Sequence, residues 1–142
     1  MESTYVGLSL DSSVVIAGEW RGHTVREILE QFKTVYGEIE VGLSVVTIVE
    51  LAHGVQRAGT DERRQRRQAF VDELIRAVPV HPVNIETARI AGRIEGAQAA
   101  IGVTIAFEDL LIAATALRLG FGRAVLRTGP DHFSVIRPLT GG

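Results

Sequence analysis

Hydrophobic positions gather most densely in one stretch near the C-terminal end, residues 105–120. At the helical period these positions cover most of the circumference. They are Leu110, Leu111, Ile112, Ala113, Ala114 and Leu117. We therefore expect a helix that is buried against a sheet. Gly120 follows it and suits the left-handed conformation just past a helix end.

The remaining apolar stretches alternate between strand and helix patterns. Strand patterns lie at residues 5–10, 41–46 and 123–126, with shorter extended pieces at 79–83 and 133–136. Helix patterns lie at residues 24–36, 47–59, 60–78 and 84–102, with a short helical turn at 14–17. Two helices open with capping-box spacing, at residues 24–27 and 47–50. This alternation predicts an α/β fold, a three-layer α/β/α sandwich with a mainly parallel central sheet.

Composition narrows the class of protein. The chain has 142 residues, of which 46% are hydrophobic and 23% charged, and we expect one domain over residues 1–142. The net charge of −2 gives no global sign of nucleic-acid binding. There is no cysteine, which excludes disulfides and cysteine zinc sites. We see neither a signal peptide nor a membrane-spanning stretch, and we expect a cytoplasmic protein.

Four acidic residues from distant parts of the chain are predicted to meet at one edge of the sheet. Asp11 ends the first strand, Glu50 follows the second, Asp109 opens the buried helix, and Asp131 follows the strand at 123–126. Sites in open α/β sheets form outside the carboxyl ends of the strands. Clustered carboxylates repel one another, and a hard cation such as Mg²⁺ or Mn²⁺ removes the conflict. Such an ion supports hydrolysis of a phosphodiester.

Each acid also has a simpler structural explanation. Asp11 and Asp131 could be turn residues, since Asp131 follows a Gly-Pro pair. Glu50 could complete the capping box of its helix. Asp109 could serve only the helix dipole, and the neighbouring Glu108 could be the functional member of the pair.

Three blocks of the sequence resemble the signature blocks of PIN-domain ribonucleases. They are Leu-Asp-Ser-Ser-Val-Val-Ile at 10–16, Ser-Val-Val-Thr-Ile-Val-Glu-Leu at 44–51, and Phe-Glu-Asp-Leu-Leu-Ile-Ala-Ala-Thr-Ala-Leu at 107–117. More narrowly, the chain resembles VapC-type toxins of bacterial toxin–antitoxin pairs, from Val6 to its end. The resemblance implies a PIN-like domain with Asp11, Glu50 and Asp109 as catalytic, metal-binding acids.

The same resemblance implies an activity and partners. It implies an endoribonuclease that depends on Mg²⁺ or Mn²⁺ and cleaves RNA, usually tRNA or rRNA. A cognate VapB-type antitoxin would silence the toxin, and a homodimer is expected.

A fourth block, at residues 127–133, departs from the family pattern. Arg127 stands where the family carries Thr, and Gly129 stands where it carries Asn. Asp131 could supply a fourth catalytic carboxylate, and His132 precedes the Phe of the block. The number of metal ions, one or two, therefore stays open.

Two rival functions remain on the sequence alone. One is a phospho-accepting receiver domain, although that class usually carries an acid pair after the first strand. The other is a PIN-like fold without catalytic activity that serves as an interaction module, and the altered fourth block favours it. Trp20, the sole tryptophan, could anchor an antitoxin or the core.

Basic residues cluster at the polar start of the helix at 60–78. They are Arg63, Arg64, Arg66 and Arg67. The cluster could steer RNA toward the acids, or it could be an ordinary solvated helix face.

Overall fold

A five-stranded sheet runs through the centre of the molecule in the computed structural model, which describes residues 5–126 and 133–136. The strand order is β3-β2-β1-β4-β5. The strands are β1 (Gly7–Leu10), β2 (Glu40–Ser44), β3 (Val80–His81), β4 (Phe121–Leu126) and β5 (Phe133–Ile136). The first four pair in parallel, and β5 pairs antiparallel with β4. The prediction of a mainly parallel sheet is confirmed.

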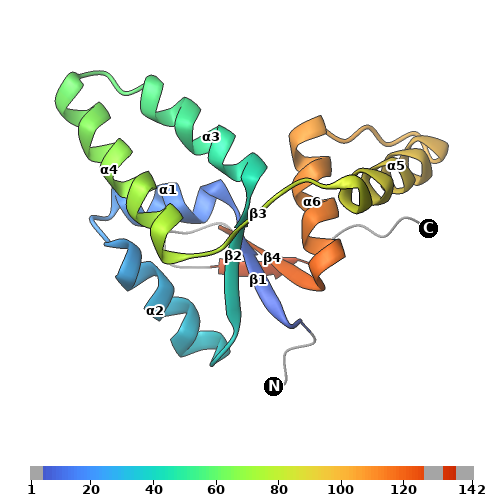
Figure 1. The fold of residues 1–142 in the computed structure, drawn as a ribbon, viewed down its shortest axis with the longest axis horizontal. Coiled ribbons are helices and arrows are strands. Elements are labelled where there is room, and N and C mark those ends of the chain that lie inside the picture. The colour runs from blue at the N-terminus through green and yellow to red at the C-terminus, as the bar shows by residue number, and fades with distance from the viewer. Residues whose placement is uncertain (1–4, 127–132, 137–142) are drawn as a thin grey trace.

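Helices cover both faces of the sheet (Figure 1). They are α1 (Ser12–Trp20), α2 (Val25–Tyr36), α3 (Val45–Gln56), α4 (Asp61–Ala77), α5 (Ile85–Ala100) and α6 (Phe107–Leu119). The first four lie on one side of the sheet, while α6 packs on the other side and carries α5 (Figure 1). The structure therefore has the three layers that the sequence predicts. No helix within the described residues has the length and apolar character needed to cross a membrane.

Two hydrophobic clusters hold the layers together. The larger one lies under α1–α4 and includes Leu8 of β1, Phe32 of α2 and Leu43 of β2, all almost fully buried. The smaller one joins α5 to α6 through Ile94 and Leu110. Because α6 packs against the sheet as well as against α5, six of its 13 residues are buried, and they lie in its apolar middle, as its sequence predicts. Gly120 ends it at φ 73°, in the predicted left-handed conformation.

The first residues of most of the helices are capped by nearby side chains, and one predicted cap differs from the observed one. The predicted capping box at Thr24 and Glu27 is present in full. The predicted box at Thr47 and Glu50 is wrong, because α3 already begins at Val45. Ser44, the last residue of β2, caps α3 by accepting a hydrogen bond from the amide of Val46 at 3.1 Å. The predicted strand at 41–46 therefore ends two residues early.

Strand order determines where a site can form. The chain moves from β1 outward to β3 and then returns to β4 on the other side of β1. The direction of winding therefore reverses between β1 and β4. Ligands of open α/β sheets bind at such a reversal, outside the carboxyl ends of the strands. Asp11 directly follows β1 at this point.

Candidate active site

Asp11 is held in place by both neighbouring elements. Its backbone amide donates to the carbonyl of Ala124 on β4 at 2.9 Å. It is also the N-cap of α1, where its Oδ2 accepts a hydrogen bond from the amide of Ser13 at 3.1 Å. The carboxylate is therefore fixed at the edge of the sheet and is only 14% exposed.

Arg123 joins two of the predicted site residues. It lies on β4 opposite Ser9 of β1, so its side chain reaches Asp11. Its Nε donates to Oδ1 of Asp11 at 3.1 Å, and its Nη2 donates to the same oxygen. The Nη2 also donates to Oδ1 of Asp109 at 3.2 Å. One guanidinium thus brings together carboxylates that are far apart in the sequence.

Asp109 reaches this point because of the direction of α6. The helix leads into the amino end of β4, so its first turn lies at the carboxyl edge of the sheet. Its N-cap residue, Ala106, makes no side-chain capping bond. The carboxylate of Asp109 is 54% exposed, and it faces Arg123. This contact gives Asp109 a role beyond the helix dipole.

Glu50 lies in the second turn of α3 and faces the same group of charges. Its Oε1 atom is buried and finds no hydrogen-bond partner among the described residues. Burial raises the pKa of Glu50, and the negative charges of Asp11, Glu108 and Asp109 raise it further, against a lowering effect from Arg123. Since the predicted capping box is absent, capping does not explain this residue.

The pKa of Asp11 changes in the opposite direction to that of Glu50. Burial raises the pKa of Asp11, but hydrogen bonds from Arg123 and Ser13, together with the charge of Arg123, outweigh it. The net effect lowers its pKa below the ordinary value, so the carboxylate is ionised at neutral pH. Burial lowers the pKa of Arg123, but its hydrogen bonds and charge interactions with Asp11 and Asp109 outweigh burial and raise it.

The predicted site residues are only partly assembled. Asp11 and Asp109 meet at Arg123, while Glu50 stays outside this ion pair. In residues 5–126 and 133–136, no three acidic or histidine side chains converge closely enough to hold one ion. The predicted fourth acid, Asp131, lies outside the described residues, as does His132.

Sequence reasoning missed one residue of this site, Arg123, and named another, Glu108, only as an alternative to Asp109. Arg123 sits 112 positions from Asp11 in the chain, and only the register of β4 against β1 reveals their contact. Glu108 is exposed, yet it lines a hollow together with Glu50 and raises the pKa of Glu50. The adjacent acids in the sequence were a signal, since both occupy the first turn of one helix.

The donor chemistry of the site fits a divalent cation. The available ligands are carboxylate oxygens, which suit Mg²⁺ or Mn²⁺. A buried, unpartnered carboxylate oxygen on Glu50 is the group that a cation would satisfy. Asp11, Glu50 and Asp109 are the residues that would hold it, with Arg123 supplying positive charge in the structure as it stands.

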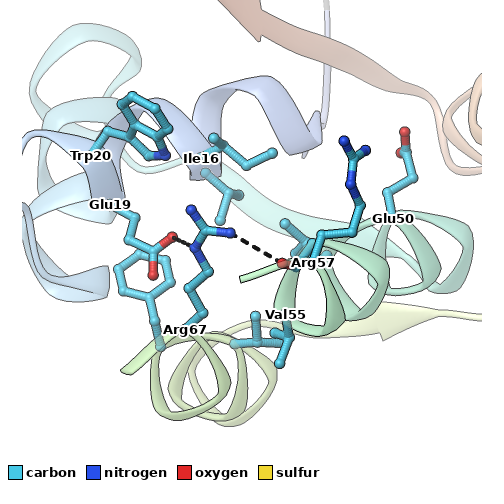
Figure 2. A pocket seen from close by; sticks show the side chains of 12 residues that line it. Ile16, Glu19, Trp20, Glu50, Val55, Arg57 and Arg67 are labelled. Carbon is cyan, nitrogen blue, oxygen red and sulfur yellow. Dashed lines mark hydrogen bonds and ion pairs between the residues drawn. The ribbon is translucent and has the colours of Figure 1, made fainter. Parts of the chain in front are cut away.

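A hollow of about 290 Å³ leads away from Glu50 between α1, α3 and α4. Figure 2 shows Glu50 at one end and Trp20 at the other, with Arg67 between them. Arg67 donates to the carbonyl of Gly54 at 3.1 Å and lies 3.9 Å from Glu19 (Figure 2). The indole of Trp20 is 76% exposed, so it does not anchor the core.

The arginine cluster at the start of α4 divides into two kinds of side chain. Arg64 pairs with Asp61 at 2.6 Å and lines neither of the two hollows. Arg63 and Arg66 instead line a second hollow that continues from the first at Trp20. Counting Arg67, three arginines and an exposed aromatic ring therefore line the same open space.

Comparisons with known proteins agree with this geometry. The PIN domain family model matches residues 8–134. Ribonuclease VapC1 of Rickettsia felis is 29% identical over 121 residues, which cover 85% of each chain. A solved structure of VapBC-5, a member of the VapBC family of toxin–antitoxin systems from Mycobacterium tuberculosis, is 30% identical with a TM-score of 0.58, covering 78% of this chain and 75% of that one. FitAcB of Neisseria gonorrhoeae is 25% identical with a TM-score of 0.65, covering 87% and 89%.

Proposed function

The chain belongs to the PIN-domain family, and on that premise we propose that it is a VapC-type toxin that cleaves RNA as a divalent-metal-dependent endoribonuclease. Family membership rejects the receiver-domain alternative. The observation that carries the proposal is the meeting of Asp11 and Asp109 at the switch point of the sheet, beside a buried carboxylate oxygen of Glu50 that has no partner among the described residues. A relative named as a VapC ribonuclease supports the reaction class.

The chain's own residues have distinct roles in this proposal. A divalent cation, when bound, supplies polarisation of a phosphoryl oxygen and a water molecule of lowered pKa. Asp11, Glu50 and Asp109 hold it, and Asp131 is the proposed fourth catalytic carboxylate. The amide of Ser13 and the carbonyl of Ala124 orient Asp11, so that it needs little rearrangement to bind.

The proposed partners follow from the same premise. The substrate is RNA, with tRNA or rRNA as the expected class, and the inhibitor is a VapB-type antitoxin that covers or disarms the acids. The solved VapBC complex supports an antitoxin partner. We also propose a homodimer and a cytoplasmic location, which size-exclusion chromatography with light scattering and cell fractionation would test.

The decisive experiment is cleavage of total RNA with and without Mg²⁺ or Mn²⁺. Wild-type protein should cut only with metal, while Asp11→Asn and Asp109→Asn should not cut. Sequencing of the fragment ends would identify the RNA and its cleavage motif. Equal cleavage by the variants would reject the site assignment.

A cellular test addresses the toxin role separately. Expression of the chain should arrest growth, and Glu50→Gln should remove the arrest. Co-expression of a short antitoxin-like reading frame found beside the gene should also relieve it. Arrest that persists in the Glu50→Gln strain would count against this proposal.

The second candidate function is a PIN-like interaction module without catalytic activity. The Arg123 bridge favours it, because two of the three proposed ligands are already paired with a guanidinium. The altered block at residues 127–133 favours it as well. Absence of both metal binding and RNA cleavage in the purified protein would decide for this module.

A further inference from the structure

The guanidinium of Arg123 binds two of the acids that are proposed to hold the metal ion. Two of its nitrogens donate to Oδ1 of Asp11, and one of these also reaches Oδ1 of Asp109. The Arg123 and Asp11 side chains are 15% and 14% exposed. Solvent ions screen so enclosed a pair only weakly. Both of these ion pairs of Arg123 lie at the acid site.

Both oxygens of Asp11 are already in use. Oδ1 accepts from Arg123, and Oδ2 accepts from the amide of Ser13. A divalent ion needs direct contact with carboxylate oxygens, at about 2.0–2.1 Å for Mg²⁺. The ion also repels a guanidinium held on the same oxygens. Oδ1 already accepts two hydrogen bonds from Arg123, so an ion that binds this oxygen must displace at least one of them.

The unpaired carboxylate of Glu50 favours the replacement of Arg123 by a divalent ion. Its buried Oε1 lacks a partner within the described residues, and Arg123 does not reach it. Within the described residues the three carboxylates do not converge around one point, and an ion that drew them together would offset the charge of Glu50 as well as the charges of Asp11 and Asp109. The single positive charge of the guanidinium pairs only with the last two. Exchange of Arg123 for a divalent ion thus satisfies a group that the hydrogen bonds of Arg123 leave unpaired.

We infer that Arg123 is a built-in counter-cation of the acid site, which must release Asp11 and Asp109 before a divalent ion binds and thereby lowers the affinity of this chain for metal. The inference rests on the proposed function in one respect, that the three acids bind a divalent ion. It adds a residue that sets the metal concentration at which the site fills. Arg123 is a positioning residue in this scheme, because it acts through the acids.

The test compares Mn²⁺ binding to wild-type protein, Arg123→Gln and Arg26→Gln by isothermal titration calorimetry. Arg26 is a matched control, since it loses the same charge from an exposed position on α2. We expect Arg123→Gln to bind Mn²⁺ about tenfold more tightly, a change large enough to resolve. Without metal it should unfold at a lower temperature than wild type, and Mn²⁺ should raise that temperature more. Equal or weaker Mn²⁺ binding by Arg123→Gln would overturn the inference.

A measurement on the wild-type protein covers the case in which Arg123→Gln does not fold. The Nε–H resonance of Arg123 should shift as Mg²⁺ is titrated, in step with the binding isotherm, because its hydrogen bond to Asp11 breaks. An unchanged resonance at Mg²⁺ saturation would overturn the inference, and so would absence of any metal binding. If Arg123→Gln binds Mn²⁺ more tightly but neither it nor the wild-type protein cuts RNA, the counter-cation stands and the proposed nuclease fails.

Discussion

The carboxylate of Asp11 accepts a hydrogen bond from the backbone amide of Ser13 at 3.1 Å while it also binds Arg123. One side chain therefore begins a helix and forms part of the acid site. The cap fixes the rotamer of Asp11, so the start of α1 contributes directly to the geometry of the site. This double role means that replacing Asp11 can damage stability and function for different reasons.

Two substitutions at Asp11 should separate these roles. Asparagine is a good N-cap residue, so Asp11→Asn should keep α1 capped while it abolishes metal-dependent RNA cleavage. Asp11→Ala should be equally inactive and, in addition, less stable than Asp11→Asn by about 1 kcal/mol, because alanine cannot cap the helix. Chemical denaturation of both variants without metal measures the difference. Equal stabilities would show that the bond to Ser13 contributes little.

The charge of Glu50 should lower the stability of the folded protein when no metal is bound. Its carboxylate is partly buried, and burial and the nearby acids both raise its pKa, which means that the folded protein disfavours the charged form. Glu50→Gln removes that charge, so we expect a higher melting temperature without metal, together with loss of RNA cleavage. Glu95→Gln, on the exposed side of α5, is the control and should change neither. A lower melting temperature for Glu50→Gln would contradict this explanation.

Much of the fold could be predicted from the sequence because its signals are local. The apolar period of α6, the capping box at Thr24 and the left-handed Gly120 all depend on neighbouring residues. The start of α3 was harder, since Ser44 and Thr47 are both plausible caps. The β-branched run at 41–46 favours a strand, yet the helix begins inside it at Val45.

In the candidate site, too, the residues with local sequence signals could be predicted, and the one that depends on strand pairing could not. Asp11, Glu50 and Asp109 were predicted because each lies close to the start of a helix or the end of a strand that its local sequence indicates. Arg123 was missed because its contact depends on the pairing of β4 with β1, a register that no local pattern specifies. The charge balance of the site could therefore not be predicted from the acids alone.

The two acids at the start of α6 should differ in importance. Asp109 binds Arg123 together with Asp11, whereas Glu108 is exposed and acts on Glu50 through its charge. We expect Asp109→Asn to abolish RNA cleavage. Glu108→Gln should keep cleavage but weaken Mn²⁺ binding about tenfold, the effect typical of outer groups around a metal. Calorimetry and cleavage assays on the same preparations measure both, and the reverse order of effects would reassign the ligand to Glu108.

Arg63 and Arg66 should contribute to RNA binding by pairing with phosphates, since they line the hollow that continues from Trp20. In an inactive Glu50→Gln background, replacing both with Gln should weaken RNA binding. It should also reduce the slope of log K against log salt by about 0.7 for each phosphate that no longer pairs with an arginine. Arg64→Gln is the matched control, because Arg64 lies on the same helix but does not line this hollow, so its replacement should leave the slope unchanged. Fluorescence anisotropy over a series of salt concentrations provides the measurement, and an unchanged slope in the double variant would identify this end of α4 as an ordinary solvated surface.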